Sequence, residues 1–444
     1  MAKQRRRREL ELLDKILLEK GELLDIETLR RKLEEEFREK LKILKAESDK
    51  ILYHWYDEPS SAWIEIDVEK LRNCLKKLFG VDYQIFKGRK IVKMKVKTLM
   101  NLCEKWGLAL NQLEKFKVFT RKFPVNLKSP IIVKLKTHML NEGSMSWRTS
   151  GRQLKGKYVN KDPVLHKYFR DLAKKIGARF RKPPKYNESK NAYDTYIDSA
   201  TIRILHKAGI QPGPKTITNP KLDPQVYFNE ELRKYHFKST FTEEGNSYLR
   251  VKGRRVLMRI SWGRGVDITE KLTPQQIEKI RQIIKPGERI AVKELIKTID
   301  DPKMARSIAK VIAASRSNLL DEEILLLRYY HKEVLNEKTL NVYSERLQLN
   351  KDGRITVFWR AYTEDAEAVE LLVKEYGMLP GTWKAQKLKK EMEIFEKYKD
   401  KELSKDEIIE IKKQIDSLPK RMSDEWRESK FKELFGEEKH EKSN

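Results

Sequence analysis

The sequence predicts an α+β fold in which a helix–strand–strand–helix–strand–strand–helix unit occurs twice. Two observations predict this fold. A short helix that ends in an acid and a glycine occurs at Glu142-Gly143 and again at Glu244-Gly245. Strand-like segments follow each helix, and each copy closes with a similar phrase that begins at Gly209 or at Gly377. A repeated order of elements indicates a duplicated architecture.

The first copy is assigned to residues 126–228, and Pro130 lies in the first turn of its opening helix, where a missing backbone N–H costs nothing. The second copy is assigned to residues 229–390, and its last two strands turn at Asp352-Gly353, a dipeptide typical of hairpins. The glycine after each acid is expected to take the left-handed conformation that ends many helices. The first copy is predicted to hold helices 129–140 and 199–207 and strands 145–148, 153–159, 178–181 and 192–197. The second copy is predicted to hold helices 229–242 and 364–376 and strands 247–251, 255–262, 340–349 and 354–361.

The second copy is longer than the first. The acid and the closing glycine are 67 positions apart in the first copy and 133 positions apart in the second. The extra residues have helical periodicity and predict a helical insertion at about residues 273–334. A helix-turn-helix and a plain helical insertion both fit this segment.

Three further regions flank the copies. Residues 1–50 predict a basic helical N-terminal region, in which Arg5–Arg8 fits either a phosphate-binding arm or a solvated helix start. Residues 51–125 predict a mixed α/β region with a strand at 63–68, a helix at 69–79, a hairpin at 84–97 and a helix at 98–116. No site chemistry is evident in this region, and residues 391–444 predict a charged helical tail.

The charge of the chain restricts its partners. Its 96 Lys and Arg residues exceed its 67 Asp and Glu residues, which gives a formal net charge of +29. Nucleic-acid phosphates or an anionic membrane surface would offset such a charge. No segment approaches the roughly 18 apolar residues of a membrane span, and the start of the chain lacks the apolar region of a secretion signal. Two cysteines fit a reducing compartment and exclude a disulfide scaffold. We therefore expect a cytoplasmic, monomeric protein that binds double-stranded DNA, with RNA as the alternative.

The two helix-terminal acids are the candidate site. If the copies pair about a pseudo-two-fold axis, Glu142 and Glu244 converge at one end of the paired helices. Two close carboxylates repel each other, and a hard cation such as Mg²⁺, which prefers oxygen ligands, would relieve that repulsion. Metal-bound water beside a phosphodiester is suited to hydrolysis. The strands of both copies would then form sheets able to lie in a DNA groove.

The two helices resemble LAGLIDADG motifs. The motif-like segments are Leu135 to Gly143 and Phe237 to Gly245, and the phrase Tyr158-x-Asn160-x-Asp162-Pro163-x-Leu165 is similar to one that follows the first motif in that family. The resemblance covers about residues 126–390. It implies the duplicated αββαββα fold with antiparallel saddle-shaped sheets, and a Mg²⁺-dependent homing endonuclease that cuts both strands of a long DNA site.

The resemblance also implies roles for individual residues. Glu142 and Glu244 correspond to the metal ligands, and Thr137 and Ser239 to positions where the paired helices touch. Lys215 and Lys384 are candidates for the basic residue that stabilises developing phosphate charge, although loop cations that contact the DNA backbone fit equally. Two departures from the family are Lys136 and Lys238, which stand where small residues are usual, and the glutamates themselves, since Asp is commoner in the first motif.

Five arginines in or beside the predicted strands are candidates for contacts with phosphate or guanine. They are Arg148, Arg152, Arg250, Arg254 and Arg255. Each taken alone also fits a solvated strand charge. Three functions stay open at this point: a sequence-specific DNA endonuclease, a non-cleaving DNA- or RNA-binding protein such as a transcriptional regulator or splicing helper, and an unrelated basic protein.

Overall fold

The computed structural model describes residues 52–53, 63–121, 124–148, 153–436. The basic N-terminal region and Arg152 therefore lie outside the described residues. The chain divides into two compact units, and each contains an antiparallel sheet covered by helices. We call the unit with residues 47–213 and 423–444 the Glu142 unit, and the unit with residues 214–422 the Glu244 unit. The α+β class with antiparallel sheets is thus confirmed.

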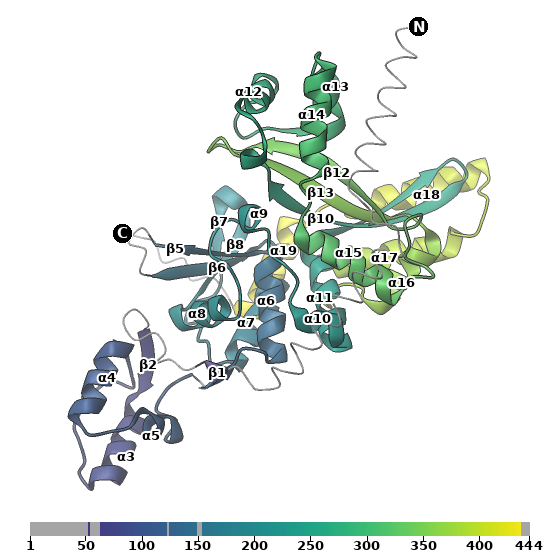
Figure 1. Cartoon of the computed structure of the whole chain (residues 1–444). Helices are drawn as coiled ribbons and strands as arrows, with labels where there is room; N and C mark the ends of the chain where they lie inside the picture. The colour runs from purple at the N-terminus through teal and green to yellow at the C-terminus, as the bar shows by residue number, and fades with distance from the viewer. Residues whose placement is uncertain (1–51, 54–62, 122–123, 149–152, 437–444) are drawn as a thin grey trace. The chain divides into compact units, whose positions relative to one another are not determined.

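The Glu142 unit holds a four-stranded sheet with the strand order β5-β6-β8-β7. Its helices lie on one face of this sheet (Figure 1). The C-terminal helix α19 (Asp424–Phe435) packs against α7. Its Phe431 ring stacks on Tyr193 of β8 at 4.6 Å. The elements are α6 (Pro130–Asn141), β5 (Gly143–Trp147), β6 (Leu154–Asn160), α7 (Pro163–Lys175), β7 (Lys185–Asn187), β8 (Ala192–Ile197) and α8 (Ser199–Lys207). A short pair of strands, β1 (Leu52–Tyr53) and β4 (Val125–Asn126), precedes them.

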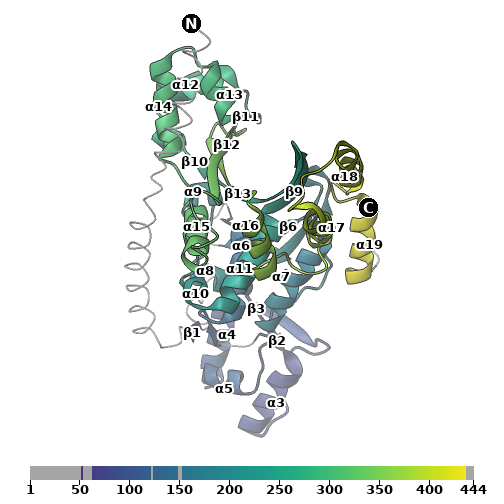
Figure 2. The same cartoon turned by 90° about the vertical axis from the view of Figure 1, so that its right-hand side faces the viewer.

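The Glu244 unit holds a five-stranded sheet with the strand order β9-β10-β13-β12-β11. Helices α11, α15 and α16 cover one face of it, as Figure 2 shows from the side. The first four strands repeat the connectivity of β5, β6, β8 and β7. The elements are α9 (Lys215–Thr218), α10 (Pro224–Phe228), α11 (Glu230–Glu243), β9 (Gly245–Lys252), β10 (Arg255–Asp267), β12 (Asn341–Leu349), β13 (Ile355–Thr363), α16 (Ala366–Glu375), α17 (Trp383–Tyr398) and α18 (Lys405–Ser417).

The predicted insertion contains a strand as well as helices. Strand β11 (Arg289–Ala291) pairs with β12 and extends the sheet at its edge. Along the chain, helix α15 follows β9 and β10 and precedes β12 and β13. Helix α7 has the same place in the Glu142 unit, after β5 and β6 and before β7 and β8. The four helices of this segment are α12 (Pro274–Ile283), α13 (Val292–Thr298), α14 (Pro302–Ala313) and α15 (Asn318–Tyr330).

Residues 63–119 form a small subdomain of the Glu142 unit that is itself internally symmetric. Strand β2 (Trp63–Asp67) leads into α3 (Val68–Phe79), and 28 positions later β3 (Ile91–Lys95) leads into α4 (Val96–Lys105). The strands pair antiparallel, and their register is symmetric about the pair Glu65 and Lys93. Ile64 and Ile66 from β2 and Val92 and Met94 from β3 all point into one apolar core. The opposite face of this ribbon therefore carries its polar side chains. A further helix, α5 (Leu110–Lys115), closes the subdomain.

Two local predictions are wrong. The hairpin expected at residues 84–97 is a loop followed by β3, because the Arg72 guanidinium binds the Ile85 carbonyl at 2.6 Å and Phe86 takes a φ of 49°. The strand expected at 178–181 is irregular, because the Phe180 ring there receives the Arg170 guanidinium at 4.6 Å. The edge strand β7 begins instead at Lys185.

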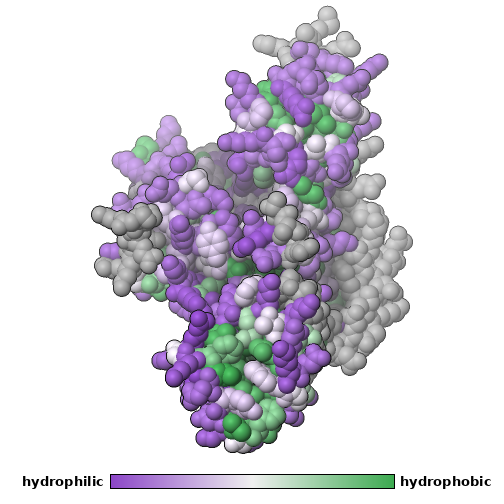
Figure 3. All heavy atoms as spheres, turned by 90° about the vertical axis from the view of Figure 1, so that its left-hand side faces the viewer, coloured by the Kyte–Doolittle hydropathy of each residue, from purple (hydrophilic) through white to green (hydrophobic). Residues whose placement is uncertain are grey.

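The described surface is dominated by charged and polar side chains, as Figure 3 shows for one face. No helix among the described residues is both long and apolar enough to cross a membrane.

Candidate nucleic-acid interface and helix-terminal acids

Glu142 is the residue at which α6 ends. Its backbone N–H donates to the His138 carbonyl at 2.9 Å, and the chain passes directly into β5. The carboxylate is half-buried and accepts a hydrogen bond from the Asn160 amide, with an Asn160 Nδ2 to Glu142 Oε1 distance of 3.1 Å. A neutral donor from β6 thus orients this acid.

The phrase around Asn160 builds the support of this site. The Asn160 carbonyl contacts His166 Nε2 at 3.0 Å, and the Asn160 side-chain oxygen accepts from the Asp162 N–H at 2.9 Å. Asp162 in turn caps α7 by accepting from the Val164 N–H. Tyr158 stacks on the α7 ring Phe169 at 4.8 Å with nearly parallel planes.

Glu244 ends α11 in the same way as Glu142 ends α6. Its N–H donates to the Thr240 carbonyl at 2.8 Å, and β9 begins at the next residue. Its carboxylate forms an ion pair with Arg264 of β10, with an Nη1 to Oε1 distance of 3.3 Å. The side chain of Arg264 is 7% exposed and that of Glu244 is 29% exposed. A buried cation therefore forms an ion pair with this acid.

Arg264 is held by a buried network that centres on Glu323 of α15. Glu323 accepts from Arg264 at 2.8 Å, from the Trp262 indole at 3.0 Å, and lies 3.0 Å from His236 Nε2. Burial alone raises the pKa of Glu323, but the Arg264 guanidinium and the His236 ring hold it below its ordinary value. Burial likewise lowers the pKa of Arg264, and its attraction to Glu323 and Glu244 reverses that effect and raises it. Both groups are therefore charged in the folded protein.

The strand registers make Asn160 and Arg264 equivalent. Gly143 pairs with Tyr158 in one sheet, and Gly245 pairs with Trp262 in the other. Two residues further along each second strand stand Asn160 and Arg264. Each therefore donates to the acid at the end of the corresponding helix from the same place in its sheet. Sequence reasoning assigned a role to neither residue, and the quoted phrase around Asn160 was the only signal for it.

The glycine after each acid has a different role from the one predicted. Neither Gly143 nor Gly245 has a positive φ, so the left-handed helix cap is wrong. A Cβ on Gly143 would lie 2.6 Å from the Met139 Cα, and a Cβ on Gly245 would lie 2.4 Å from the Phe241 carbonyl oxygen. Glycine is needed in both units because the strand leaves in contact with the last turn of its helix.

Thr137 and Ser239, the predicted helix-contact positions, are both buried. The Thr137 hydroxyl donates to the Val133 carbonyl of its own helix at 3.2 Å. Lys136 and Lys238, the unexpected cations, are half-buried. Glu142 and Glu244 belong to different units, so their convergence stays a prediction.

The two candidate lysines differ in whether they lie in the same unit as the acid that each was predicted to assist. Lys384 is the second residue of α17, and its ammonium donates to the Gly245 carbonyl at 2.7 Å and to the Glu243 carbonyl at 3.2 Å. It thus binds the carbonyls on either side of Glu244, one at the end of α11 and one at the start of β9. Lys215 is the first residue of α9, which lies in the Glu244 unit. Glu142 belongs to the other unit, so a role for Lys215 beside Glu142 stays a prediction.

The candidate arginines lie in varied surroundings. Arg148 is exposed just after β5, and Arg255 is exposed at the start of β10. Arg250 pairs with Glu364 at 2.8 Å. Arg254 donates to the Leu403 carbonyl at 2.9 Å and pairs with Glu402, so it fastens the β9–β10 turn to the segment before α18.

The face of the Glu244 sheet opposite α11, α15 and α16, which α9 contacts beside Gly265, carries a larger set of cations than the sequence predicted. Paired residues of antiparallel strands share a face, and the registers place a single set of side chains opposite the covering helices. This arginine–aromatic face consists of Arg250, Arg255, Arg259, Arg289, Arg346, Arg360, Lys252, Tyr248, Tyr343, Phe358 and Tyr362. Two acids, Glu345 and Glu364, pair with some of these arginines.

Guanidinium groups and rings alternate on this face. Arg259 lies over Tyr362 at 4.4 Å, and Arg346 lies over Phe358 at 4.9 Å. Tyr343 meets Tyr362 edge to face at 5.5 Å. Guanidinium groups held in this way are ordered donors for phosphate and base edges, and the rings offer stacking surfaces. The alternation of β12 and β13 could have revealed this face once their pairing was known.

The uncovered face of the Glu142 sheet is also basic. The register places Lys157 beside Tyr196 and Lys155 beside Ser146 on the side away from α6 and α7. Lys157 pairs with Asp194 at 2.7 Å, and Tyr196 is 63% exposed. Cations therefore exceed acids on the open faces of both sheets.

The two helix-terminal acids differ in how well they suit a divalent cation. Among the residues that the structure describes, no three His, Cys, Asp or Glu side chains gather into a metal-binding group. Glu142, with a neutral amide as its β6 partner, fits a cation that takes one or two carboxylates and keeps its waters. Glu244 fits less well, because its carboxylate already forms an ion pair with Arg264, which Glu323 shares.

The comparisons with known proteins find similarity among solved structures. No known protein family and no curated relative matches this sequence. Among solved structures, the chain is similar to the LAGLIDADG meganuclease I-AabMI bound to uncleaved DNA, with 11% identity over 66% of this chain and 100% of that chain. The TM-score of this superposition is 0.31.

Proposed function

We propose that this protein binds double-stranded DNA across the uncovered faces of its two antiparallel sheets, as a duplicated protein of LAGLIDADG type. The arginine–aromatic face of the Glu244 sheet is the observation that carries this proposal. A twisted antiparallel ribbon fits the major groove, and arginine is the side chain best suited to bind both phosphates and guanine. The net charge of +29 adds a sequence-independent attraction to the same partner.

The duplicated units support the family resemblance beyond the motif letters. In both units a helix ends at a glutamate, a glycine begins the first strand, and the second strand presents a donor to that glutamate. We propose that the two units pair through α6 and α11 and that both sheets then face one DNA duplex.

Metal-dependent hydrolysis of the bound DNA is proposed at Glu142. There the Glu142 carboxylate would hold Mg²⁺, and Asn160 would keep the carboxylate oriented. The metal supplies an activated water and neutralises phosphate charge when bound. The ion pair between Glu244 and Arg264 favours a second candidate function, binding without cleavage of both strands, because a cation at this position competes with a metal.

One set of binding and cleavage measurements tests these proposals. Sites selected from a random duplex library would be used as labelled probes for the full-length protein, and the salt dependence of binding would be measured. Substituting both Arg255 and Arg346 by alanine should reduce the slope of log affinity against log salt by about 2, since each phosphate contact contributes about 0.9. The matched control replaces Lys389 and Lys390, two exposed lysines of α17, and should keep the wild-type slope. Equal slopes for both double variants would contradict the assignment of this face.

Cleavage of the selected duplex with Mg²⁺ separates the two candidate functions. Glu142→Gln should reduce strand cleavage by about 100-fold or more while binding is kept or strengthened, because the amide cannot hold the metal and no longer repels phosphate. Glu244→Gln should change cleavage much less, since the ion pair with Arg264 competes with a metal for that acid. If the wild-type protein binds the duplex and cleaves neither strand, the binding-only function is correct.

A further inference from the structure

The small subdomain and the first sheet enclose a groove in the Glu142 unit. The groove has a volume of about 590 Å³ and is open to solvent. The polar face of the β2–β3 ribbon lines one side, and β6, β8 and the start of α8 line the other. Among the described residues, its basic and aromatic lining consists of Trp63, Lys93, Arg148, Lys155, Tyr196 and Arg203, and Asp198 is the acid that lines it.

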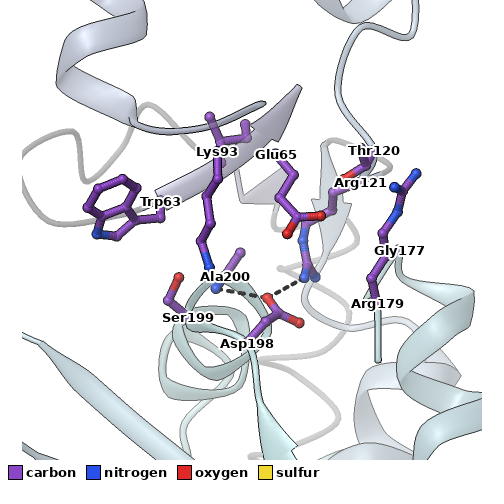
Figure 4. A pocket seen from close by; sticks show the side chains of 11 residues that line it. Trp63, Glu65, Lys93, Thr120, Arg121, Gly177, Arg179, Asp198, Ser199 and Ala200 are labelled. Atoms are coloured by element: carbon purple, nitrogen blue, oxygen red, sulfur yellow. Dashed lines mark hydrogen bonds and ion pairs between the residues drawn. The ribbon is translucent and has the colours of Figure 1, made fainter. Parts of the chain in front are cut away.

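Ion pairs and a hydrogen bond connect the two walls of the groove. Arg121, which follows the small subdomain, pairs with Asp198 at 2.6 Å and donates to the Thr201 hydroxyl at 2.9 Å. On the subdomain itself, Glu65 pairs with Arg181 at 3.0 Å. Figure 4 shows this junction, with Arg121 directed at Asp198 and with Lys93 extending from β3 toward the first turn of α8. Because Arg121 neutralises Asp198, the charge that remains in the groove is that of its lysines and arginines.

The groove continues the open face of the first sheet. Lys155 and Tyr196 line the groove, and they also lie on the uncovered side of β6 and β8. Lys93, Arg148 and Lys155 are exposed, whereas Arg203 is buried among helix α8 residues with 5% exposure. A line of cations therefore runs from the sheet to the β2–β3 ribbon, with Trp63 and Tyr196 along it. Cations interleaved with aromatic side chains along a groove bind nucleic-acid backbones and stack on their bases or sugars.

We propose that this groove binds the phosphodiester backbone of nucleic acid beyond the stretch that lies on the first sheet. The small subdomain is thereby a footprint extension, which contacts phosphates through Lys93, Arg148 and Lys155 and packs Trp63 and Tyr196 against sugars or bases. This inference rests on the proposed function, since the strand must first lie on the sheet.

The test is a salt titration of binding between the full-length protein and a labelled mixed-sequence duplex. Substituting Lys93, Arg148 and Lys155 together by alanine should lower the log–log salt slope by about 2 to 3 and weaken binding at low salt by about tenfold or more. The matched control replaces Lys76, Lys97 and Lys105, three exposed lysines on α3 and α4, which cover the other face of the ribbon. This control removes the same charge and should keep the wild-type slope.

A photo-crosslinking variant provides a second measurement that does not depend on lost charge. With p-benzoylphenylalanine in place of Tyr196, irradiation should attach the protein to the duplex, and the same group in place of the exposed Phe79 should not. Two equal slopes for the triple variants, together with no crosslink from position 196, would overturn this inference while leaving the sheet-face proposal intact. If the wild-type protein does not bind the duplex at all, the proposed function and this inference both fail. A crosslink only to a single-stranded oligonucleotide would also overturn the duplex footprint.

Discussion

The two helix-terminal acids stand in equivalent positions but have different partners. In the Glu142 unit the partner is the neutral side chain of Asn160, which is supported by backbone contacts to α7. In the Glu244 unit the partner is the buried cation Arg264, which depends on the fully buried acid Glu323. One exchange between Asn and Arg therefore changes the charge of the site, and it requires a second charged group beneath it.

This difference shows how one backbone arrangement can serve two tasks. A neutral donor orients a carboxylate and adds no charge of its own beside it. A guanidinium orients the carboxylate through an ion pair, so that the acid becomes part of a structural network. An isolated buried charge is costly, and for this reason Arg264, Glu323 and His236 occur together.

The largest expected effect is a difference in unfolding free energy between variants of Arg264 and of Asn160. Arg264→Asn, which copies the Glu142 unit, should destabilise the protein by about 3–5 kcal/mol, because it leaves the Glu323 carboxylate buried without its main partner. Asn160→Ala should cost only about 1 kcal/mol, the usual value for one hydrogen bond. Urea unfolding followed by the intrinsic tryptophan fluorescence of the chain would measure both changes. The double variant Arg264→Asn with Glu323→Gln should recover part of the loss, and an Arg264→Asn variant no less stable than Asn160→Ala would contradict the network.

A smaller and more equal effect is expected at the two glycines. Gly143→Ala and Gly245→Ala should each cost about 1–3 kcal/mol, because the new methyl group would collide with the last turn of the preceding helix. The exposed neighbours Ser144 and Asn246 provide controls, and their alanine variants should unfold close to the wild-type midpoint. Thermal unfolding of the four variants makes the comparison. Tolerance of alanine at only one glycine would mean that the two helix–strand junctions are not equivalent.

The smallest expected effect is the loss of stability in acid that the Glu323 carboxyl causes. The pKa of Glu323 is depressed by Arg264 and His236, so its contribution to stability is fully present above the unfolded-state value of about 4.3 and is lost as the pH falls through the folded-state value. Glu323→Gln should therefore show a flatter decline of unfolding free energy below about pH 5 than the wild-type protein. Asn160→Ala serves as the comparison from the other unit and should keep the wild-type slope. A Glu323→Gln profile parallel to the wild-type profile would indicate that this carboxyl is neutral in the folded state.

Much of the local structure was predictable because it depends on neighbouring residues. Alternating and helical periodicities located β8, α8, β12 and β13 to within a few residues, and they located the helices that end at Glu142 and Glu244. The predictions at residues 84–97 and 178–181 were wrong because Arg72 and Arg170, from the helices that precede these segments, contact them, and strand periodicity does not record such contacts.

The candidate site was predictable only in part. The acids and their glycines were visible as a repeated phrase, whereas Arg264, Glu323 and His236 are separated by up to 87 positions in the sequence. Such groups come together only through helix packing, and no periodicity records it. The arginine–aromatic face likewise depends on which residues of five strands are paired, since a shift of one residue would send every one of these side chains to the covered side.

The sequence by itself therefore determined the order of elements, the strong positive charge and the two helices that end in Glu-Gly, because each is a property of composition or of residues a few positions apart. The tertiary structure decided that Asn160 and Arg264 are equivalent, that the glycines serve close packing rather than a left-handed turn, and that the cations gather on one face of each sheet. These outcomes depend on strand register and on the burial of charge, and both arise only when distant segments of the chain meet.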